Sequence, residues 1–464
     1  MGFFTFTNCF RRGWPELGTD SLTRRAGKGF YRVCTSGAYP LLLPWLLRKY
    51  TEGLDERRGV YSEETRRAFD GGPLWIHAVS VGEAQSAWPL LDALRPAGGE
   101  KNLFPVLLST TTTTGKEMAF RLADGLFERH IYYPWDIPRI VNRALDAIRP
   151  RGYATMETEI WPNMLFSLAR RGVPAFLVNG RFSERTARTM RKHPSFWRMV
   201  YDCFTLLLVR SETDKETLLS LGVPAERIRV TGDCKVDALL LRRRNACLGP
   251  LEALFGVRPG DPPHDDAKRP SERDPLFLAG STHEGEEAIV LDAFIRVRRV
   301  FPSARLVIAP RHPERAGDVC ALASEVAPSA LLSDVERQTA SSRPDIVVVD
   351  RIGVLFDLYG VVDAAFIGGS LVDKGGQNIL EPAAFGTPLS HGPYMRDFVE
   401  AAKDLGALGI ATRVGDASEI AAHWEASMKP ERRAAVRESA ERYFRASGGA
   451  ARLSADEING VILR

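Results

Sequence analysis

The sequence predicts an α/β protein made of two similar halves, each a parallel β-sheet with helices on both faces. Short apolar runs alternate with segments of helical spacing from about residue 74 onward, and this alternation is typical of parallel strands joined by crossover helices. The pattern stops over residues 245–275, where several prolines and mixed charge indicate a linker or surface loop, and it then resumes. The chain is therefore expected to form two α/β domains rather than one.

The apolar runs give the expected strands in order along the chain. Strands or strand ends are expected at 74–81, 104–115, 152–159, 173–181, 203–212 and 227–233 in the first half, and at 276–282, 304–312, 345–350 and 363–370 in the second. The last part of the chain has helical spacing. We therefore divide the chain into a basic N-terminal segment, a first α/β domain, a linker, a second α/β domain and a C-terminal helix, at residues 1–49, 50–240, 241–275, 276–440 and 441–464.

The composition is that of a soluble globular protein. Hydrophobic residues make up 44% and charged residues 26% of the 464 residues, which is ordinary and allows a sizeable core. The formal net charge of +4 is too small to indicate nucleic-acid binding by itself. Six cysteines are scattered without a CxxC pair, so no zinc or redox motif is indicated and a reducing compartment is expected.

The N-terminal segment is basic and contains an apolar stretch. Residues 1–49 carry eight Lys or Arg against two acidic residues, which indicates either a solvated tail or contact with an anionic membrane surface. The apolar stretch at 30–47 contains Arg32, Pro40 and Pro44 and falls short of the roughly 20 apolar residues of a spanning helix. It also lacks the form of a signal peptide. A helix lying in the membrane surface is expected, with a plain buried helix as the alternative.

Acidic and basic residues gather at the predicted strand ends of the first half. Glu83 follows a strand and Gly82 at the start of a helix, so it is either a carboxylate that favours the helix dipole or a general base held at a rigid turn. Glu157 and Glu159 end another strand; in an extended chain their side chains alternate, and only one would face the ligand. Lys235 also follows a strand, where it is either a surface residue or a partner for developing negative charge.

The second half contains a glycine-rich stretch at a strand end, GGSLVDKGGQNILEPAAFGTP at 368–388. Glycines let a helix N-terminus approach a phosphate closely, and neither the P-loop nor the GxGxxG spacing occurs there. Asn378 would donate to a phosphate, and Glu381 would accept hydrogen bonds from a ribose diol. Arg311, directly after another strand, suits bidentate phosphate binding or forms a surface turn. This pattern favours a nucleotide-sugar site over a dinucleotide site.

Seven motifs in this order resemble a known family. The stretches WIHAVSVGE, METEIWPN, NGRFSERTAR, VTGDCKVD, GSTHEGEE, PRHPER and the glycine-rich stretch are similar to those of the 3-deoxy-D-manno-octulosonic acid (Kdo) transferases of Gram-negative bacteria, over roughly residues 50–440. The resemblance implies a GT-B fold, in which two Rossmann-like domains face a central cleft. It implies an acceptor site in the N-terminal domain and a CMP-Kdo site in the C-terminal one.

The resemblance also implies roles for individual residues. Glu83 would be the proton acceptor, and Glu157 and Lys235 would stabilise the transition state. The loop that usually reads TMGEL in the family reads RIGVL here, so Val354 stands where a glutamate is usual and only backbone contacts are expected there. The residues that would bind CMP are Pro310, Arg311, Ile352, Gly353, Val354, Asn378, Ile379, Leu380 and Glu381.

The activity implied is inverting transfer of Kdo from CMP-Kdo to the lipid A precursor, lipid IVA, in lipopolysaccharide core biosynthesis. It needs no cofactor and no metal, and the sequence has no DxD motif of the metal-dependent nucleotide-sugar enzymes. The implied location is the cytoplasmic face of the inner membrane, with the protein peripheral or anchored by its N-terminus, and no nucleic-acid partner is expected. Two alternatives from the residues alone are a sugar-nucleotide epimerase of the same fold and a two-lobed ligand-binding protein, which would need a secretion signal that we do not find.

Overall fold

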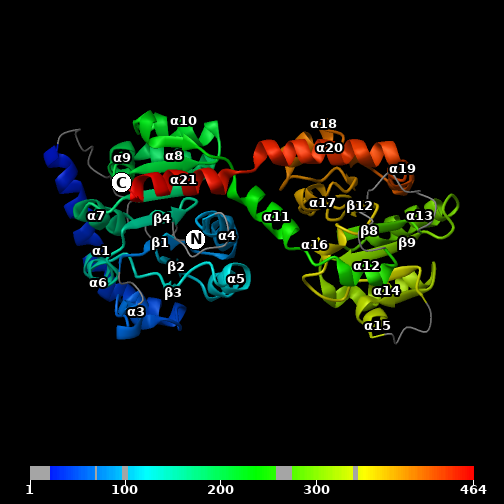
Figure 1. Cartoon of the computed structure of the whole chain (residues 1–464), viewed down its shortest axis with the longest axis horizontal. Helices are drawn as coiled ribbons and strands as arrows, with labels where there is room; N and C mark the ends of the chain where they lie inside the picture. The colour runs from blue at the N-terminus through cyan, green and yellow to red at the C-terminus, as the bar shows by residue number, and fades with distance from the viewer. Residues whose placement is uncertain (1–20, 68–70, 97–102, 258–273, 338–342, 464) are drawn as a thin grey trace. The chain divides into compact units, whose positions relative to one another are not determined.

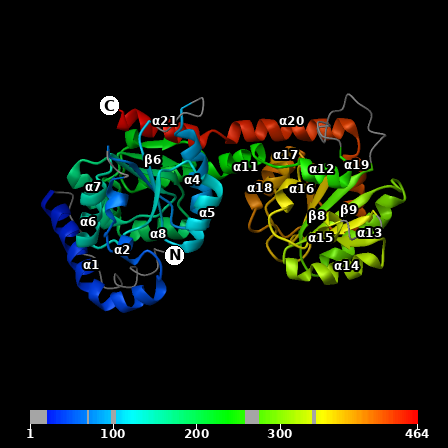
Figure 2. The same cartoon turned by 60° about the horizontal axis from the view of Figure 1, so that its bottom comes forward.

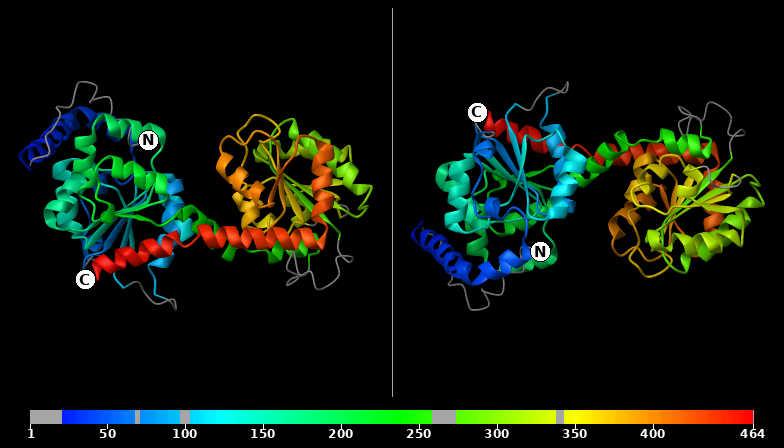
Figure 3. Two further views of the ribbon diagram at one scale, coloured as in Figure 1. Left: turned by 90° about the horizontal axis from the view of Figure 1, so that it is seen from above. Right: turned by 90° about the horizontal axis from the view of Figure 1, so that it is seen from below.

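The computed structural model describes residues 21–67, 71–96, 103–257, 274–337 and 343–463. The chain forms two compact units, one of Met1–Ala238 with Ser447–Arg464 and one of Leu239–Ala446 (Figure 1). Each unit is a parallel sheet with helices on both sides (Figures 2 and 3). This is the α/β fold of two sheets that the alternating pattern predicts.

The first unit contains a seven-stranded sheet of order β3-β2-β1-β4-β5-β6-β7, in which all neighbouring pairs are parallel. The order changes direction at β1 and β4, where crevices for ligands form in doubly wound sheets. The strands are β1 (Leu74–His77), β2 (Val106–Thr110), β3 (Arg129–Tyr132), β4 (Gly152–Met156), β5 (Ala175–Gly180), β6 (Leu206–Val209) and β7 (Ile228–Val230).

The helices of this unit cover both faces of the sheet. Helices α4, α5 and α21 pack near one another, and α6, α7, α9 and α1 form a second group. Several begin with proline at the first helical position, where its missing N–H costs no hydrogen bond, as in α6, α7 and α9. The helices are α1 (Ser21–Lys49), α2 (Leu54–Arg57), α3 (Glu63–Arg67), α4 (Val81–Ala93), α5 (Thr113–Ala123), α6 (Pro138–Ile148), α7 (Pro162–Arg171), α8 (Glu184–Lys192), α9 (Pro194–Tyr201), α10 (Glu212–Ser220), the 3₁₀ turn η2 (Ala225–Arg227), the start of α11 (Cys234–Arg244), and α21 (Ala450–Ile462).

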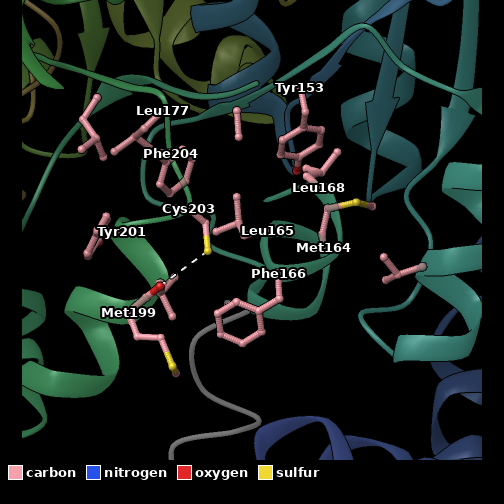
Figure 4. Packing of buried hydrophobic residues seen from close by; sticks show 14 of the residues in the cluster. Tyr153, Met164, Leu165, Phe166, Leu168, Leu177, Met199, Tyr201, Cys203 and Phe204 are labelled. Carbon is pink, nitrogen blue, oxygen red and sulfur yellow. Dashed lines mark hydrogen bonds between the residues drawn. The ribbon is translucent and has the colours of Figure 1, made fainter. Parts of the chain in front are cut away.

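The core of the first unit lies between the sheet and the α6, α7 and α9 group. Figure 4 shows side chains from β4, α7 and the segment joining α9 to β6 meeting in this layer. Tyr153, Leu165 and Phe204 are almost completely buried, and Cys203 Sγ lies 3.5 Å from the Met199 carbonyl oxygen. Strands that are buried on both faces consist of continuous runs of apolar residues, which is the pattern found in the sequence.

Helix α1 packs on the first unit and leaves apolar side chains exposed. It continues through Pro40 and Pro44, and its Tyr39, Leu43 and Leu46 pack against the small cluster of Trp135, Ile137 and Ile140. On its other side Val33 and Leu41 are 71% and 84% exposed. Within the described residues, no helix combines the length and apolar character that crossing a membrane requires. Residues 1–20 of the predicted N-terminal segment lie outside the described residues.

The C-terminal end of the chain returns to the first unit as α21. Asp237 in α11 caps this helix, since its carboxylate accepts hydrogen bonds from the Gly449 and Ala451 backbone N–H groups at 2.6 and 2.8 Å. The side chain of Ile462, at the other end of the helix, packs against Gly152 in β4. Ala451, Ala455 and Ile458 of α21 are buried, so this helix is part of the core of the first unit.

The second unit has the sheet order β10-β11-β9-β8-β12-β13-β14, again with parallel pairs throughout. The change of direction lies at β8 and β12. The strands are β8 (Leu276–Thr282), β9 (Arg305–Pro310), β10 (Ser329–Leu331), β11 (Ile346–Val348), β12 (Ala364–Ile367), β13 (Leu389–His391) and β14 (Ala411–Arg413).

Helices flank this second sheet, and its core contains the stacked rings of Phe277 and Trp424, whose centroids are 4.9 Å apart. A buried ion pair joins Arg433 to Asp363 at 3.1 Å. The helices are the end of α11, α12 (Gly249–Phe255), α13 (Glu286–Arg298), the 3₁₀ turn η3 (Pro313–Arg315), α14 (Ala316–Ser324), α15 (Leu332–Glu336), α16 (Leu355–Leu358), α17 (Leu380–Phe385), α18 (Val399–Ala407), α19 (Ala417–Ser427) and α20 (Pro430–Ser447).

Candidate functional site

Glu83 lies at the start of α4, just beyond the carboxyl end of β1. Its carboxylate turns back to accept hydrogen bonds from the Val79 backbone N–H at 2.6 Å and from Ser80 Oγ at 3.3 Å. The side chain is buried, with 8% exposure. The strand-to-helix turn therefore fixes the carboxylate in one orientation at the edge of the sheet where ligands bind in this class of fold.

The surroundings of Glu83 favour its protonated form. Burial, together with the negative charges of Glu159 and Glu157, raises the pKa of Glu83 to about 8 against the opposing hydrogen bonds from Val79 and Ser80. A carboxyl group with a pKa near the working pH is suited to proton transfer. Perturbed titration of this kind is characteristic of functional sites.

Glu157 follows β4 in a left-handed backbone conformation, with φ of 54°. Its carboxylate oxygen Oε1 accepts a hydrogen bond from Ser86 Oγ at 3.3 Å and lies 2.8 Å from Lys235 Nζ. These contacts bring α4, the end of β4 and the first turn of α11 to one point. The three residues predicted as catalytic, Glu83, Glu157 and Lys235, thus lie at the same edge of the first sheet.

Glu159 belongs to the same cluster, although strand alternation predicted that only one of Glu157 and Glu159 would face it. The strand ends at Met156, so alternation does not apply beyond it. The Glu159 backbone carbonyl accepts the Thr155 hydroxyl at 2.8 Å, and burial raises the pKa of the Glu159 carboxyl. The negative charges of Glu157 and Glu159 both raise the pKa of Glu83.

Asn179 and Asp233 fix the position of Lys235. Asn179, at the end of β5, has a φ of 57°, and its Oδ1 accepts the Cys234 backbone N–H at 2.9 Å. Asp233 Oδ1 accepts the Lys235 backbone N–H at 2.9 Å. Both residues satisfy N–H groups at the start of α11. Sequence reasoning quoted the motifs that contain them but gave them no role, because the contact between residues 179 and 234 is not local.

In the second unit, the buried carboxylate of Glu286 holds the glycine-rich loop. One oxygen accepts the His283 and Gly369 backbone N–H groups at 2.9 and 2.7 Å, and the other accepts those of Ser370 and Leu371 at 3.0 and 2.9 Å. Sequence reasoning missed this residue, although it lies within the GSTHEGEE motif.

Two glycines of this loop are required by its geometry. A Cβ at Gly368 would come within 2.4 Å of the Ser281 carbonyl oxygen, so the end of β12 can approach β8 only without a side chain. Gly369 has a φ of 66°, in the region that favours glycine. These glycines therefore allow the ends of two strands to approach each other closely.

Basic groups surround the loop. The rings of His283 and His312 lie 5.9 Å apart, and a Cβ at Gly369 would be 3.3 Å from His283 Nε2. Burial lowers the pKa of His283, and the nearby charges of His312, Lys374 and Arg311 lower it further while Glu286 opposes them. Arg311 follows the buried Pro310 at the end of β9. The loop thus carries the positive group of Lys374 and lies near Arg311 and a neutral His283; Lys374 and His283 were not singled out from the sequence.

The NILE segment opens α17 beside this loop. Asn378 Oδ1 accepts the Leu380 backbone N–H at 3.1 Å, so the amide caps the helix start, and Asn378 Nδ2 lies 3.5 Å from Glu381 Oε1. Ile379 is buried and packs inward. Burial raises the pKa of Glu381, against the effects of Arg242 and Asn378.

The RIGVL loop lies before α16. Ile352 is 85% exposed, Gly353 has a φ of 101°, and Val354 precedes the first helical residue. Of the predicted contacts at 352–354, the loop can offer only backbone groups and an apolar surface. Among the described residues, no cluster of three or more His, Cys, Asp or Glu side chains has an arrangement suited to a metal ion.

The two parallel seven-stranded sheets, each with polar groups at the carboxyl ends of its strands, have the architecture of the GT-B fold. The fold is shared with the crystal structure of a UDP-GlcNAc 2-epimerase from Neisseria meningitidis bound to UDP-GlcNAc, with a TM-score of 0.53 and 14% identity over 84% of this chain and 99% of that one. At this identity the likeness concerns the fold alone, which confirms the predicted class.

The chain belongs to the 3-deoxy-D-manno-octulosonic acid transferase family, as the motifs predicted. It is 30% identical over 459 residues to the transferase of Bordetella pertussis, covering 93% of this chain and 99% of that protein. It is also 30% identical over 356 residues to the transferase of Haemophilus influenzae, covering 76% and 77%. Residues 52–238 match the family model described as 3-deoxy-D-manno-octulosonic-acid transferase (kdotransferase). The protein is therefore a glycosyltransferase of the Kdo transferase family, and the epimerase alternative retains only a likeness of fold.

Proposed function

We propose that this protein transfers Kdo from CMP-Kdo to a hydroxyl group of the lipid A precursor, lipid IVA, with inversion at the anomeric carbon and with Glu83 as the general base. The observation that carries the proposal is the environment of Glu83, a buried carboxyl whose pKa is raised to about 8 beside the Glu157–Lys235 pair. The family membership supplies the sugar that is transferred, and the site supports how the transfer proceeds.

The acceptor hydroxyl is a weak nucleophile at neutral pH and must lose its proton as it attacks. A carboxylate with a raised pKa is a stronger base than an ordinary one, and a positioned base contributes about 10²–10⁴-fold to the rate. The hydrogen bonds from Val79 and Ser80 hold the Glu83 carboxylate in place before the acceptor binds. Attack from the side opposite the leaving group inverts the anomeric centre, as in inverting glycosidases.

Lys235 would stabilise negative charge that develops as the bond to CMP breaks. Its side chain is 44% exposed, and Glu157 holds the ammonium group at 2.8 Å. The exposed part of the ammonium group would then meet a reacting phosphate or carboxylate. A donor held in place before the reaction stabilises developing charge without having to reorganise.

CMP-Kdo would bind to the second unit through groups already held in place. The glycine-rich loop, the positive groups of Arg311 and Lys374 and the imidazole of His283 would receive the phosphate. Pro310, the backbone of 352–354 and the Asn378–Glu381 segment would enclose the nucleoside, with Glu381 accepting hydrogen bonds from the ribose diol. The step requires only these side chains and backbone groups, and we propose no cofactor for it.

The acceptor is a phosphorylated lipid, so the enzyme must work at a membrane surface. Helix α1 presents the exposed side chains of Val33, Leu41 and Trp45, and it ends with Arg48 and Lys49. An apolar face with flanking basic residues suits a helix lying in the interface of an anionic membrane. We propose that the protein is peripheral on the cytoplasmic face of the inner membrane, with α1 in contact with lipid.

A transfer assay tests the proposal. Purified protein receives CMP-Kdo generated in place and a tetraacylated lipid A precursor, and the products are weighed by mass spectrometry. The expected product is heavier by one or more Kdo units. The Glu83→Gln variant, which keeps the shape of the side chain, should form it at least about 100-fold more slowly while binding CMP as the wild type does. The exposed Glu117 on α5 provides a matched Glu117→Gln control that should retain full activity. Equal rates for Glu83→Gln and wild type would contradict the role of Glu83, and no product from a wild type that binds CMP would contradict the acceptor.

A further inference from the structure

Arg242, on the last turns of α11, makes two contacts beside the proposed nucleotide site. Its guanidinium carbon lies 3.9 Å from the ring centroid of Phe356 in α16. Its Nη1 lies 3.6 Å from Oε1 of Glu381 in α17. Arg242 therefore connects the helix after the RIGVL loop to the helix that opens with the NILE segment.

The two contacts together restrict Arg242 strongly. A guanidinium stacked on an aromatic ring loses the freedom to rotate out of that plane, so its edge remains directed at Glu381. The side chain is 43% exposed and that of Glu381 23% exposed. A ligand can therefore approach the pair, while partial burial limits the screening of the two charges by water.

The side-chain amide of Asn378 contacts the same oxygen of Glu381. Asn378 Nδ2 lies 3.5 Å from Oε1, the oxygen that Arg242 approaches. Both groups thus lie on the side of one carboxylate oxygen, and this favours an orientation in which the second oxygen, Oε2, points away from them. A carboxylate held by one oxygen can offer the other to a hydroxyl group in a defined direction, which lowers the entropy lost on binding.

We propose that Arg242 is a positioning residue for the nucleotide, holding Glu381 ionised and oriented to accept the hydroxyl groups of the CMP ribose. This inference rests on the proposed function, because it takes cytidine monophosphate as the leaving group and Glu381 as the ribose acceptor. It assigns to the end of α11 a part in donor recognition, whereas Lys235 at the start of the same helix contacts Glu157. The neighbouring loop offers an apolar side chain at Val354, and Glu381 is the carboxylate that the NILE segment would offer to the ribose.

The charged and titratable groups around Glu381 determine what removal of Arg242 should do. Arg242 and Asn378 lower the pKa of Glu381 against its burial. Tyr359, packed below, has its pKa raised by burial and by Glu381, so it stays neutral. Asp357 in α16 has its pKa raised by burial, and Arg242 opposes this. Without Arg242, both carboxyl groups would take up protons at higher pH, and a protonated Glu381 offers one acceptor fewer.

The experiment compares CMP with 2′-deoxy-CMP by calorimetric titration. Wild type should bind CMP at least about tenfold more tightly, the effect of a hydrogen bond to a charged group. In the Arg242→Met variant, which keeps an unbranched side chain on Phe356, this preference should fall to about twofold or less, with little change in the affinity for 2′-deoxy-CMP. Arg243→Met, at the neighbouring exposed position, should keep the preference. An equal loss of affinity for both nucleotides, or no loss of affinity for either, would overturn the assignment.

The pH dependence separates positioning from a general structural effect. The ratio of the two affinities cancels the titration of the phosphate that both ligands carry. On acidification this ratio should fall as Glu381 takes up a proton, and in Arg242→Met the fall should begin at a higher pH than in wild type, because Arg242 lowers the pKa of Glu381. Arg242→Lys keeps a positive charge but not the planar stack, so the fall should begin at nearly the same pH as in wild type while the ratio itself is smaller. In the Arg242→Met background, Asp357→Asn should leave the pH dependence in place, and its disappearance would contradict the role of Glu381.

The titrations also separate this inference from the proposed function. Binding of CMP requires neither the acceptor lipid nor transfer. A wild type that binds no cytidine nucleotide would contradict both the donor and the role of Arg242. A wild type that discriminates the ribose, with an Arg242→Met variant that still discriminates it equally, would contradict the inference alone. Should Arg242→Met fail to fold, the Arg242→Lys titration decides, since a preference for CMP over 2′-deoxy-CMP equal to that of wild type would contradict the inference.

Discussion

The ammonium group of Lys235 lies 2.8 Å from Oε1 of Glu157, and the hydroxyl of Ser86 donates to the same oxygen at 3.3 Å. A residue at the start of α11 and one in α4 thereby hold a carboxylate that follows β4 with a φ of 54°. The left-handed backbone is unusual for a residue with a side chain, and such conformations concentrate at functional sites. The contact gives the acidic cluster around Glu83 a fixed cation.

Replacing Lys235 by methionine should slow Kdo transfer without preventing CMP binding. The substitution removes the charge and keeps the length of the side chain, so kcat should fall by about 10²–10³-fold, the loss typical of one transition-state donor. Single-turnover transfer and calorimetric titration with CMP measure the two effects. The control is Lys215→Met in α10, where the lysine pairs with the mostly exposed Glu212 at 3.0 Å, and it should leave both unchanged. Loss of CMP binding in Lys235→Met to the same extent as transfer would contradict a role confined to the transition state.

The raised pKa of Glu83 predicts that its removal stabilises the protein at alkaline pH. The folded-state pKa of about 8 lies above the ordinary value of 4.5, so the folded protein retains a proton that the unfolded chain has lost. The contribution of this carboxyl to stability is therefore complete below about pH 4.5 and decreases as the pH rises to 8. Glu83→Gln is neutral at every pH, so it should melt at a higher temperature than wild type at pH 8.5 and at nearly the same temperature at pH 4.5. Each kcal/mol of difference in the free energy of unfolding should shift the melting temperature by about 2–4 °C.

Thermal melts of both proteins at several pH values measure this difference. The Glu117→Gln variant, at an exposed position of α5, should show the same offset from wild type at each pH. A Glu83→Gln protein that melts below wild type at pH 8.5 would show that the hydrogen bonds from Val79 and Ser80 outweigh the cost of burying the charge. The combination of higher stability and lost activity is expected of a residue retained for chemistry.

The carboxylate of Glu159 predicts a shift in the pH profile of the reaction. Because a base must be ionised to act, kcat/KM for the acceptor should rise with pH and level off above about 8, the pKa of Glu83. Glu159→Gln removes a neighbouring negative charge that raises this pKa, so the rising limb should move to lower pH. The profile is measured with saturating CMP-Kdo. A limb at the same pH in wild type and variant would show that Glu159 has no electrostatic effect on the base.

Much of the fold could be predicted from the sequence because buried strands of parallel sheets are continuous apolar runs. The four strands that the sequence did not indicate are short or polar: RHIY of β3, SAL of β10, LSH of β13 and ATR of β14. Three of them, β3, β10 and β14, lie at the edges of their sheets, where fewer neighbours cover the side chains, and β13 lies between β12 and β14. Apolar patterning carries little signal at such positions, and tertiary pairing determines them.

The candidate site was predictable where its residues follow strands, and unpredictable where they meet by long-range contacts. Glu83 and Arg311 each directly follow a strand or its turn, so topology alone brings them to the ligand edge. The contact of Glu286 with Gly369 spans 83 residues, and that of Asn179 with Cys234 spans 55. Such pairs depend on strand register and loop conformation, which one sequence does not reveal.

The four hydrogen bonds accepted by Glu286 predict that a neutral substitute cannot replace it. One oxygen accepts from His283 and Gly369 and the other from Ser370 and Leu371. In Glu286→Gln one oxygen becomes an amide nitrogen, which is a donor, and it would face two backbone N–H groups that are themselves donors. Each buried N–H left without an acceptor costs about 1–3 kcal/mol, so the second unit should be destabilised and the glycine-rich loop released. The loop would then lose its fit to phosphate, and CMP affinity should fall at least about tenfold.

Hydrogen exchange and calorimetric titration with CMP test this prediction together. The amides of residues 369–371 should exchange faster in Glu286→Gln than in wild type, while those of β1 and β4 in the first unit should be unaffected. The adjacent Glu284, which is exposed, provides the control Glu284→Gln, expected to exchange and bind CMP as wild type does. Unchanged protection of the loop in Glu286→Gln would mean that its conformation is fixed by the packing of Gly368 against Ser281 and not by the carboxylate. Faster exchange with unchanged CMP affinity would instead show that the phosphate is held by the surrounding basic residues rather than by the loop backbone.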